Sequence, residues 1–475
     1  MNYIDYFKEI CGIAHVSFHT DNLRSYCEQF AKEHSLRYIK DTYGNIIIFK
    51  DASKGCENRP AVILQGHLDM VGAKAEEVVH DFINDPVILD DKAYEEGFLK
   101  AQGTTLGGDD GIAVAYALSI LADDTIKHPP IEAVFTTNEE VGLLGANALD
   151  CTPLKGRYML NLDSEEEGCF LTGCAGGIRS DLKLELKLCD KEGILVNLCI
   201  SGLTGGHSGT EIGSGRPSAN MLMGRILCYL DEKLHFNIKS INGGVVDNAI
   251  STMCMAEILI NPEDYCKITG ICNNILNDIK CEYEALEQNI ILNITKDNKC
   301  MQKVIDDEHT EKILFILSNL MQGVIKRSAE DINFVETSLN FGILKCEEDS
   351  FLAGYSIRSQ YASAKYELTS RLERLIEYVG GTYEESGDYP AWPHRIKSEL
   401  RDKIKKLYKE MYGKEPVFQI IHAGLECGII SEKMPELDII SMGPDIFSIH
   451  TPEEKMSIAS ADRVYDFIVK LLERL

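Results

Sequence analysis

Apolar and polar positions alternate between strand-like and helix-like patterns over the first 183 residues. Short apolar runs rich in β-branched residues are typical of buried strands, whereas apolar residues that recur every three or four positions are typical of helices. Strands that alternate with helices predict an α/β sheet covered by helices on both faces. The expected strands lie within residues 44–49, 60–70, 131–140 and 158–163, and the expected helices near residues 23–33 and 111–122.

The pattern changes between residues 184 and 390. Alternating apolar and polar residues predict half-exposed strands there, separated by amphipathic helices. This α+β texture indicates a second domain inserted into the first, because residues 391–475 return to apolar strands and a final helix that would complete the first sheet. We therefore predict one domain from residues 1–183 and 391–475, and an inserted domain from residues 184–390. Elements of the insert are expected at residues 195–203, 248–260, 289–296 and 308–324, and the closing elements at 417–424, 437–443 and 460–475.

The composition is that of a globular protein with an acidic surface. The chain has 475 residues, of which 44% are hydrophobic and 26% are charged, and it is long enough for two or three cores. Its 48 lysines and arginines against 75 aspartates and glutamates give a formal net charge of −27. Such a surface would repel phosphate backbones and anionic lipids, so we expect neither nucleic acid nor a membrane as a partner.

The cysteines and the first residues of the chain favour a reducing compartment. The 16 cysteines are scattered and form no Cys-x-x-Cys pair, so most are expected to be buried, reduced thiols. The opening residues carry acids and lack the basic and apolar regions of a signal peptide. No apolar run approaches the length that spans a bilayer. We therefore expect a cytoplasmic protein.

Acid-bearing polar segments follow three of the predicted strands, and strand ends are where open α/β sheets build their sites. His67 and Asp69 are two positions apart after one strand and share a face. A structural hydrogen-bonded pair is at least as common as a metal-binding histidine with its carboxylate partner. Asp109 and Asp110 follow paired glycines at the start of a predicted helix, where one aspartate could serve only as the N-cap.

Further acids and a C-terminal histidine complete a candidate set. Glu139 and Glu140 follow the next strand, Asp163 follows another, and His450 lies in a loop, where a lone histidine is more often incidental than a ligand. Two imidazoles and three carboxylates around the shared Asp109 can hold two divalent ions. Mixed nitrogen and oxygen ligation suits zinc, and also manganese or cobalt at some cost in affinity.

Nine short segments carry a further pattern: LQGHLDMV, TTLGGDDGIA, NEEVGLLGA, LDSEEEG, GCAGGI, GLTGGHSG, SGDYPAW, HAGLECGI and IHTPEE. In this order they closely resemble the aminoacyl-histidine dipeptidases, also called Xaa-His or β-alanyl-histidine dipeptidases. That group belongs to a co-catalytic zinc superfamily with carboxypeptidase G, the aminoacylases and peptidase T. The resemblance covers nearly the whole chain. It implies a zinc-peptidase catalytic domain, with a central mixed sheet flanked by helices, and an inserted α+β lid domain.

For the metal centre, the resemblance implies two zinc ions per chain, with cobalt or manganese as possible substitutes. Asp109 would bridge the two ions. His67 and Asp163 would complete one position, and Glu140 and His450 would complete the other.

Two more residues would act beside the ions. Asp69 matches the aspartate behind the zinc-bound histidine, and Glu139 matches a general base that is held close to the metal-bridging water without being a ligand. The implied reaction is hydrolysis of Xaa-His and other short dipeptides with a free amino terminus, in which Glu139 moves a proton from water to the leaving amine.

In the family the peptide bond after the residue that Asp109 matches is commonly cis. The chain contains no Gly-x-Ser-x-Gly elbow that would indicate a serine nucleophile.

Five residues of the second half match substrate-binding positions of the family. His207 matches a histidine that stabilises the tetrahedral oxyanion, in related dimers from the partner subunit, which implies a homodimer formed through the lid. Arg358 matches an arginine whose planar guanidinium can bind a substrate carboxylate. Asn220, His422 and Gly424 are further matches. Any of the five could instead be a packing or structural hydrogen-bonding residue.

Two alternatives stay open. Tripeptidases and aminoacylases of the same superfamily use a similar metal set, so the ligands identify hydrolysis and not the substrate. A catalytically inactive binding or scaffold homologue is expected to have lost a ligand or the base, whereas the full set remains here. Two departures flank ligands and bear on metal preference: Asp110 stands where asparagine is frequent, and Val141 where alanine is common.

Overall fold

The structure is a computed structural model that describes residues 1–297, 299–329 and 332–475. The chain forms two compact units. Unit 1 consists of Met1–Cys174, Trp392–Ile420 and Leu425–Leu475, and unit 2 of Ala175–Ala391 and Ile421–Gly424. The domain boundary expected after residue 183 falls inside strand β8 (Gly176–Glu185), which belongs wholly to unit 2 because it pairs along its length with a strand of that unit.

Unit 1 is built on an eight-stranded mixed sheet within the described residues. Its four central strands are parallel to one another, and the strands added at the edge that begins with β1 are antiparallel. The central strands are buried throughout because both faces of the sheet are covered, as continuous apolar runs predict. In spatial order the strands are β1 (Arg37–Lys40), β2 (Ile46–Lys50), β5 (Ile131–Thr136), β3 (Val62–His67), β6 (Tyr158–Asn161), β21 (Asp438–Ser441), β7 (Cys169–Cys174) and β20 (Val417–Ile421).

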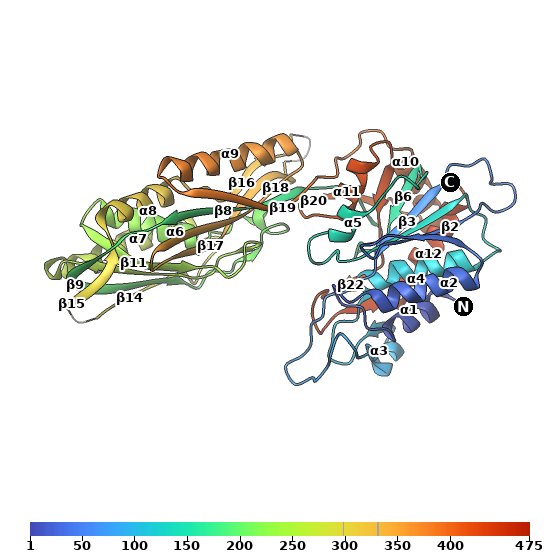
Figure 1. Cartoon of the computed structure of the whole chain (residues 1–475), viewed down its shortest axis with the longest axis horizontal. Helices are drawn as coiled ribbons and strands as arrows, with labels where there is room; N and C mark the ends of the chain where they lie inside the picture. The colour runs from blue at the N-terminus through green and yellow to red at the C-terminus, as the bar shows by residue number, and fades with distance from the viewer. Residues whose placement is uncertain (298, 330–331) are drawn as a thin grey trace. The chain divides into compact units, whose positions relative to one another are not determined.

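Helices from both ends of the chain pack on this sheet (Figure 1). The apolar helix α4 (Gly108–Ala122) contacts β3 and is itself covered by α1 (Tyr3–Cys11), so nearly all of its residues are buried. A helix that is apolar all round is expected in such a position. The same core includes α2 (Asp21–Glu33), α10 (Glu399–Tyr412) and α12 (Ile458–Leu472), while the short α5 (Leu144–Ala148) contacts α11 (Glu426–Lys433).

A small antiparallel sheet joins distant parts of unit 1. It consists of β22 (Ile446–Phe447), β23 (Lys455–Ser457) and β4 (Phe98–Lys100), which follows the short helix α3 (Asp91–Glu95). The loop between β22 and β23 carries His450. This sheet therefore brings a C-terminal loop next to the segment that leads into α4.

Unit 2 has a ten-stranded antiparallel sheet within the described residues. Eight strands form a continuous order, and two more pair at its side: β15 with β9 and β16 with β17. In spatial order the eight are β14 (Ile291–Lys296), β9 (Leu188–Ser201), β13 (Cys254–Ile260), β11 (Phe236–Gly243), β17 (Val335–Glu347), β18 (Ser350–Ser359), β8 and β19 (Thr382–Tyr389); the side strands are β15 (Cys300–Ile305) and β16 (Gly323–Arg327).

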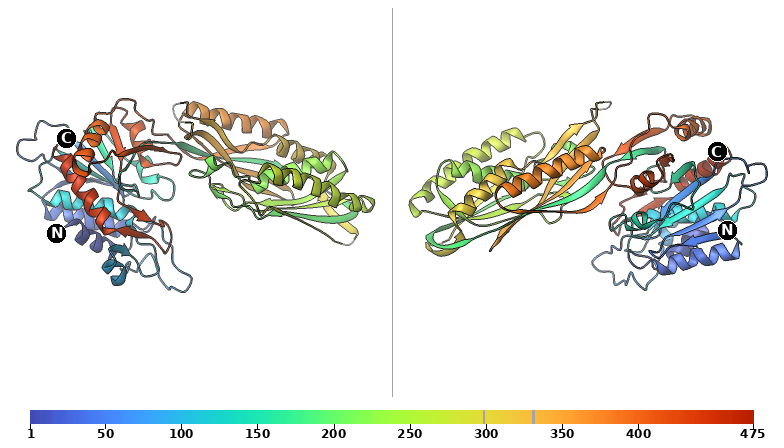
Figure 2. Two further views of the ribbon diagram at one scale, coloured as in Figure 1. Left: turned by 180° about the vertical axis from the view of Figure 1, so that it is seen from behind. Right: turned by 45° about the horizontal axis from the view of Figure 1, so that its top comes forward.

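Four helices share one core with this sheet and lie on one of its faces (Figure 2). They are α6 (Ala219–Asp231), α7 (Tyr265–Glu282), α8 (Asp307–Asn319) and α9 (Ala362–Tyr378), and a two-stranded sheet of β10 (Gly206–His207) and β12 (Ala249–Ile250) lies nearby in the chain. The α/β architecture with a mixed central sheet and an α+β insert is thereby confirmed. The strand expected at residues 248–260 is divided into β12 and β13.

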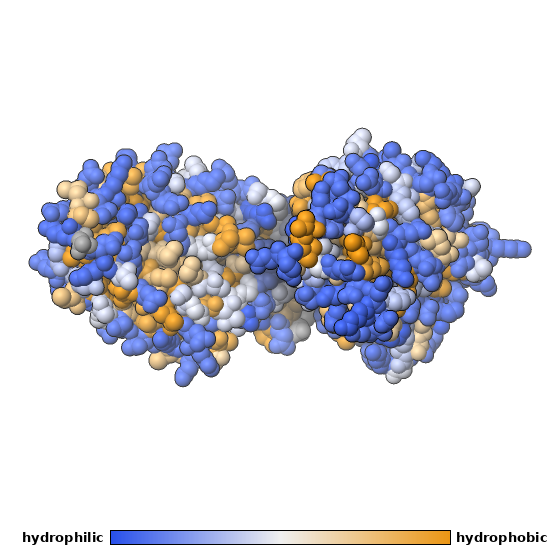
Figure 3. All heavy atoms as spheres, turned by 90° about the horizontal axis from the view of Figure 1, so that it is seen from below, coloured by the Kyte–Doolittle hydropathy of each residue, from blue (hydrophilic) through white to orange (hydrophobic). Residues whose placement is uncertain are grey.

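Hydrophilic residues cover much of the face shown in Figure 3, with smaller hydrophobic areas between them. This distribution agrees with the excess of acidic residues in the sequence. Within the described ranges, none of the helices combines the length and the apolar character needed to cross a membrane.

Candidate metal centre

Three neighbouring parallel strands of unit 1 end at the same edge of the sheet. His67 is the last residue of β3, Glu139 follows β5 after two intervening residues, and Asp163 follows β6 after one. The order β5–β3–β6 places β3 between the other two. The polar segments that follow the predicted strands therefore meet at this edge, as expected for the carboxyl ends of parallel strands.

Asp109 lies between two imidazoles. Its Oδ1 is 3.1 Å from Nε2 of His67, and its Oδ2 is 3.2 Å from Nε2 of His450. Asp163 Oδ1 lies 3.6 Å from Nε2 of His67, and Glu140 Oε1 lies 2.9 Å from Nε2 of His450. The aspartate thus presents one carboxylate oxygen to each of two histidine–carboxylate groups.

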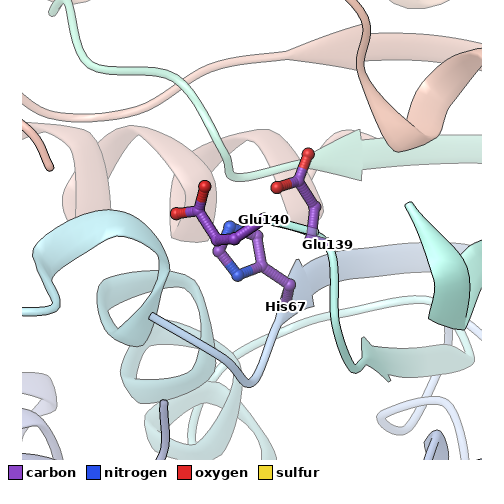
Figure 4. A group of neighbouring side chains, drawn as sticks. All are labelled: His67, Glu139 and Glu140. Atoms are coloured by element: carbon purple, nitrogen blue, oxygen red, sulfur yellow. The ribbon is translucent and has the colours of Figure 1, made fainter. Parts of the chain in front are cut away.

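These side chains form groups that could hold metal ions. His67, Asp109 and Asp163 offer ligand atoms within 4.8 Å of one another, and so do Asp109, Glu140 and His450. A third group of that size combines His67 with Glu139 and Glu140 (Figure 4). One imidazole nitrogen and two carboxylates in each of the first two groups fit zinc, manganese or cobalt, and the shared Asp109 fits two adjacent ions.

Asp69 holds both sides of this cluster through different atoms. Its backbone carbonyl is 2.8 Å from Nδ1 of His67, which therefore carries its proton there and leaves Nε2 available as a ligand. The Asp69 carboxylate, 3.7 Å from the same Nδ1, accepts the backbone N–H groups of Glu139 at 2.9 Å and Glu140 at 3.3 Å. It also accepts the Ser17 hydroxyl at 2.8 Å. The buried carboxylate thus fixes the backbone that carries the two glutamates.

The adjacent glutamates leave a sharp turn in different directions. Asn138 precedes them with a φ of 56°, a left-handed conformation that asparagine tolerates better than most residues. Its Oδ1 accepts the backbone N–H of Phe18 at 2.5 Å. Figure 4 shows the carboxylates of Glu139 and Glu140 diverging above His67. Neighbouring positions can thereby serve different partners.

The start of α4 packs tightly against the end of β3. The peptide bond between Asp109 and Asp110 is cis, as the resemblance implies. Asp110 is buried, and its Oδ2 accepts the backbone N–H of His67 at 3.1 Å. A Cβ atom on Gly66 would lie 2.5 Å from that oxygen and 2.4 Å from Cβ of Ala113. Glycine at position 66 is therefore needed for α4 to approach the strand that ends in His67.

Hydrogen bonds between imidazoles and carboxylates, together with burial, shift the pKa values of the cluster. Hydrogen bonds to Asp109 and Glu140 raise the pKa of His450 to about 10. Burial opposes the charged form of His67, but its bonds to Asp109 and Asp163 outweigh that effect and raise its pKa well above the usual value. Burial raises the pKa of Asp163 to about 6. Burial also raises the pKa of Glu139 well above its usual value, and the neighbouring carboxylates add to that shift. Divalent cations would take the place of the protons on such a cluster.

Arg358, Tyr389 and Gly424 form one contact group in unit 2. Arg358 is 9% exposed, and its Nη1 donates to the Tyr389 hydroxyl at 2.8 Å. Its buried Nε has no hydrogen-bond partner among the described residues. A Cβ atom on Gly424 would lie 2.6 Å from the Tyr389 ring, so glycine allows this ring to approach. The group presents a guanidinium with donor capacity left over.

His207 and His422 lie near this guanidinium. Burial lowers the pKa of His422 to about 3, and the charge of Arg358 adds to that shift. The same two causes lower the pKa of His207, so both imidazoles are neutral near pH 7. Nε2 of His422 is 2.7 Å from the Ser338 hydroxyl, and Nδ1 of His207 accepts the N–H of Gly209 at 3.3 Å, which leaves the proton of His207 on Nε2.

Asn220 has mainly structural contacts. It is fully buried at the start of α6, its Nδ2 donates to the carbonyl of Phe341 at 3.2 Å, and its backbone N–H donates to the Ser251 hydroxyl at 3.0 Å. A Cβ atom on Gly243 would lie 2.1 Å from its Oδ1. These bonds tie α6 to β17 and to Ser251, which follows β12, while the buried Oδ1 of Asn220 has no hydrogen-bond partner among the described residues.

Residues 63–474, most of the chain, match the sequence model of peptidase family M20/M25/M40. The chain belongs to this family. It is therefore a peptide-bond hydrolase of the M20 type. The match includes every residue of the cluster around Asp109 and the whole of unit 2.

Full-length relatives of this M20 peptidase are known. The cytosol non-specific dipeptidase of Escherichia coli K12 is 36% identical over 478 residues, which cover 99% of this chain and 97% of that protein. The crystal structure of an aminoacylhistidine dipeptidase from Vibrio alginolyticus is 35% identical, with a TM-score of 0.91, and the match covers 100% of this chain and 96% of the other. A tripeptidase from Staphylococcus aureus, 15% identical with a TM-score of 0.55 over 100% of this chain and 97% of the other, shares the fold.

A buried polar network next to the candidate metal ligands of this M20 peptidase was not predicted from the sequence. Oε2 of Glu426 accepts Nε2 of Gln65 at 2.6 Å and the Thr136 hydroxyl at 2.5 Å, while Oε1 of Gln65 accepts Nδ2 of Asn161 at 2.6 Å. Burial raises the pKa of Glu426 to about 7. Gln65, Thr136 and Asn161 stand two to four residues before the candidate ligands His67, Glu140 and Asp163. Glu426 lies within the HAGLECGI segment, but its contacts come from residues some 290–360 positions away, so no local pattern could identify it.

Proposed function

We propose that this M20 peptidase is a metal-dependent dipeptidase that hydrolyses Xaa-His and other short dipeptides with a free amino terminus. The observation that carries the proposal is the placement of Asp109, with one carboxylate oxygen at 3.1 Å from His67 and the other at 3.2 Å from His450. Its full-length relatives are named as a non-specific dipeptidase and an aminoacylhistidine dipeptidase, which supports this substrate class.

The metal set follows from the two groups that share Asp109. His67 and Asp163 would hold one ion together with Asp109, and Glu140 and His450 would hold the other. The neutral nitrogen and anionic oxygen donors suit two zinc ions per chain, with cobalt or manganese as substitutes. The carbonyl of Asp69 supports the assignment because it fixes the tautomer in which His67 offers Nε2.

The side chains of the chain then divide the work of hydrolysis. When bound, two divalent ions would polarise the scissile carbonyl and make a water acidic enough to lose a proton near pH 7. Glu139 is the general base that receives this proton on its carboxylate and passes it to the nitrogen of the leaving amine. Asp69 keeps Glu139 in place by accepting its backbone N–H. Neither step requires a covalent bond between the substrate and the chain.

Unit 2 is proposed as a lid that binds the rest of the substrate. Arg358 would bind the substrate carboxylate through its remaining donors. His207 would donate from Nε2 to the developing oxyanion, across the interface of a homodimer formed through unit 2. His422 and Gly424 would support Arg358 by contact with its surroundings, and Asn220, whose buried Oδ1 has no hydrogen-bond partner among the described residues, would take part in substrate binding. The neutral state of His207 supports its role as a donor that adds no positive charge before the reaction.

A cytoplasmic location is part of the proposal. The Escherichia coli relative is named for the cytosol, and all 16 cysteines of this chain are free thiols. Reduced thiols in this number are expected in a reducing compartment. Cysteines labelled by a thiol reagent in freshly lysed cells would agree with this location, whereas recovery of the protein from an oxidising compartment would contradict it.

A substrate panel tests the proposed specificity. Purified protein of measured metal content is assayed with alanyl-histidine, carnosine, other dipeptides, tripeptides and N-acetyl amino acids. The proposal predicts turnover of dipeptides, with alanyl-histidine among the better substrates. Faster turnover of tripeptides or N-acetyl amino acids would favour the tripeptidase or aminoacylase alternative, and no turnover by metal-loaded protein would favour the binding or scaffold homologue.

A further inference from the structure

A second glutamate of the C-terminal loop, Glu454, is buried where the mechanism above gives it no part. It lies four residues after His450, between β22 and β23, and is 2% exposed. Its neighbour Glu453 is exposed and pairs with Nζ of Lys100 at 2.6 Å. Burial of a carboxylate costs free energy unless hydrogen-bond donors replace the lost water. The donors around Glu454 therefore indicate which part of the chain it stabilises.

The Glu454 carboxylate accepts four consecutive backbone N–H groups. Oε2 receives those of Leu106 at 2.8 Å and Gly107 at 3.2 Å, and Oε1 receives those of Gly108 at 2.8 Å and Asp109 at 3.5 Å. These groups lie in the turn that leads into α4, where the dihedral angles of Asp109 and Asp110 are non-helical, and buried N–H groups in such a turn need acceptors from elsewhere in the chain. An anion is favoured at this end by the helix dipole. Glu454 therefore anchors the turn that leads into α4 from a segment more than 340 residues away in sequence.

The glycines before Asp109 suit this contact. Gly107 has a φ of 72°, the left-handed region in which glycine carries no steric penalty. A Cβ atom on Gly108 would lie 3.2 Å from Oε1 of Glu454, closer than ordinary contact. The turn thus lets both oxygens of one carboxylate reach successive amides.

The other end of the contact holds a strained loop. His450 has a φ of 61° and Ser448 a φ of 55°, conformations that a non-glycine residue keeps only when its surroundings fix them. Two residue pairs between β22 and β23 close this loop at its base. Glu454, the residue before β23, joins the loop to the residues before Asp109. His450 and Asp109 are therefore connected by a route that does not pass through a metal ion.

We propose that Glu454 is a positioning residue that sets the separation of Asp109 and His450, and thereby the affinity of the metal position that these two share with Glu140. The proposal rests on the proposed function, because it presumes that this position holds a metal. The Glu454 carboxylate joins the segment before Asp109 to the loop that carries His450 before an ion is bound. The ion then meets ligands that are already in place, which lowers the cost of ordering them.

The test compares Glu454→Gln with the matched variant Glu453→Gln. The amide of Glu454→Gln keeps the size of the side chain but turns one acceptor oxygen into an N–H₂ group that faces two backbone N–H donors. Metal-free proteins are titrated with zinc in competition with a chromogenic chelator, and their thermal unfolding is recorded with and without zinc. We expect the zinc concentration that half-saturates the weaker site to rise by about 10–100-fold in Glu454→Gln, the range for residues that orient metal ligands. The same concentration should stay unchanged in Glu453→Gln.

A third variant separates position from charge. Glu454→Asp keeps the negative charge but withdraws the carboxylate by one methylene from the backbone N–H groups before Asp109. If this contact matters, the half-saturating zinc concentration of the weaker site should rise in this variant too. A half-saturating zinc concentration equal to that of the wild type, in Glu454→Gln or in Glu454→Asp, would overturn the proposal. So would the loss of cooperative unfolding in both variants even with zinc, because Glu454 would then be needed for the fold. Wild-type protein that binds no zinc would contradict the proposed function itself, and the same titration shows this before any variant is compared.

Discussion

Adjacent carboxylates are unfavourable at a strand end unless each has a separate partner. In this chain Asn138 turns the backbone with a φ of 56°, and Asp69 accepts the N–H groups of both Glu139 and Glu140. Glu140 then lies 2.9 Å from His450, whereas the Glu139 carboxylate diverges from it (Figure 4). The different surroundings of the two side chains favour a base at one position and a ligand at the other.

The division between base and ligand predicts opposite outcomes for two similar substitutions. Glu139→Gln removes the proton acceptor, so kcat should fall by about 10²–10⁴-fold, the usual contribution of a general base, with metal content unchanged. Glu140→Gln replaces an anionic ligand by a neutral amide and should lose metal. Metal content is measured by mass spectrometry beside the rate of alanyl-histidine hydrolysis. Because Glu139 also belongs to a possible ligand group, loss of metal in Glu139→Gln would assign it as a ligand instead.

Residues in short motifs could be predicted from the sequence, whereas residues that act through distant contacts could not. His67, Asp109, Glu140, Asp163 and His450 stand in recognisable segments, and the structure brings them together. Glu454 shares a segment with His450, but its partners are backbone N–H groups that carry no side-chain signal. The role of Asp69 was expected through its carboxylate, yet its carbonyl contacts His67, a distinction that no residue pattern records.

At the scale of elements, the site depends on how closely α4 approaches β3. Asp109 and Asp110 lie in a non-helical kink at the start of α4, and this helix packs along the strand that ends in His67. The approach is possible because Gly66 has no side chain. Relative movement of these two elements would change the distance between His67 and Asp109 without altering any ligand.

Gly66→Ala should therefore weaken both the fold and the metal centre. Its Cβ would lie 2.4 Å from Ala113 and 2.5 Å from Asp110, and such overpacking costs about 1–3 kcal/mol. We expect the melting temperature to fall by about 2–4 °C for each kcal/mol lost in a unit of this size. The zinc concentration needed for half-saturation should rise. Gly270→Ala, at a helical glycine with open space around it, is the control and should be neutral or slightly stabilising. An unchanged melting temperature in Gly66→Ala would contradict the packing described here.

Elements with strong periodicity were predicted well, and their ends were predicted less well. The helix expected near residues 23–33 is α2, and the strand expected at residues 158–163 contains β6. The helix expected at residues 308–324 stops at Asn319, because Leu320 is extended and Gly323 begins β16 with a φ of 95°. The apolar pattern continues past the helix because the next strand is also apolar, so periodicity alone could not locate the boundary.

At the scale of the whole molecule, both ends of the chain belong to unit 1, and the inserted segment folds as a second unit with its own core. The metal-ligand candidates all lie in unit 1, and the substrate-binding candidates all lie in unit 2. Residues 421–424, which include His422 and Gly424, belong to unit 2 although the sequence pattern placed them with the C-terminal part of the first domain. The division indicates that ion binding and substrate binding can be altered separately.

The proposed homodimer makes a prediction that depends on His207 acting across the interface. Glu139→Gln and His207→Ala should each be inactive alone, because one lacks the base and the other the oxyanion donor. In a mixed dimer, one site would combine Glu139 of one subunit with His207 of its partner, so partial activity should return after the variants are mixed and allowed to exchange. Light scattering and differential tags establish that mixed dimers form. If they form and remain inactive, His207 acts within one chain or has no part in the reaction.

The most direct test of the central claim is a zinc titration of chelated protein, followed by the rate of alanyl-histidine hydrolysis. We predict that chelation abolishes hydrolysis and that the rate returns as about two zinc ions per chain are bound, as a two-metal site requires. Thermal unfolding in the same samples shows that the chelated protein remains folded. Full hydrolysis by folded protein without metal, or no hydrolysis after two ions are bound, would contradict the assignment of this chain as a dinuclear metal-dependent dipeptidase.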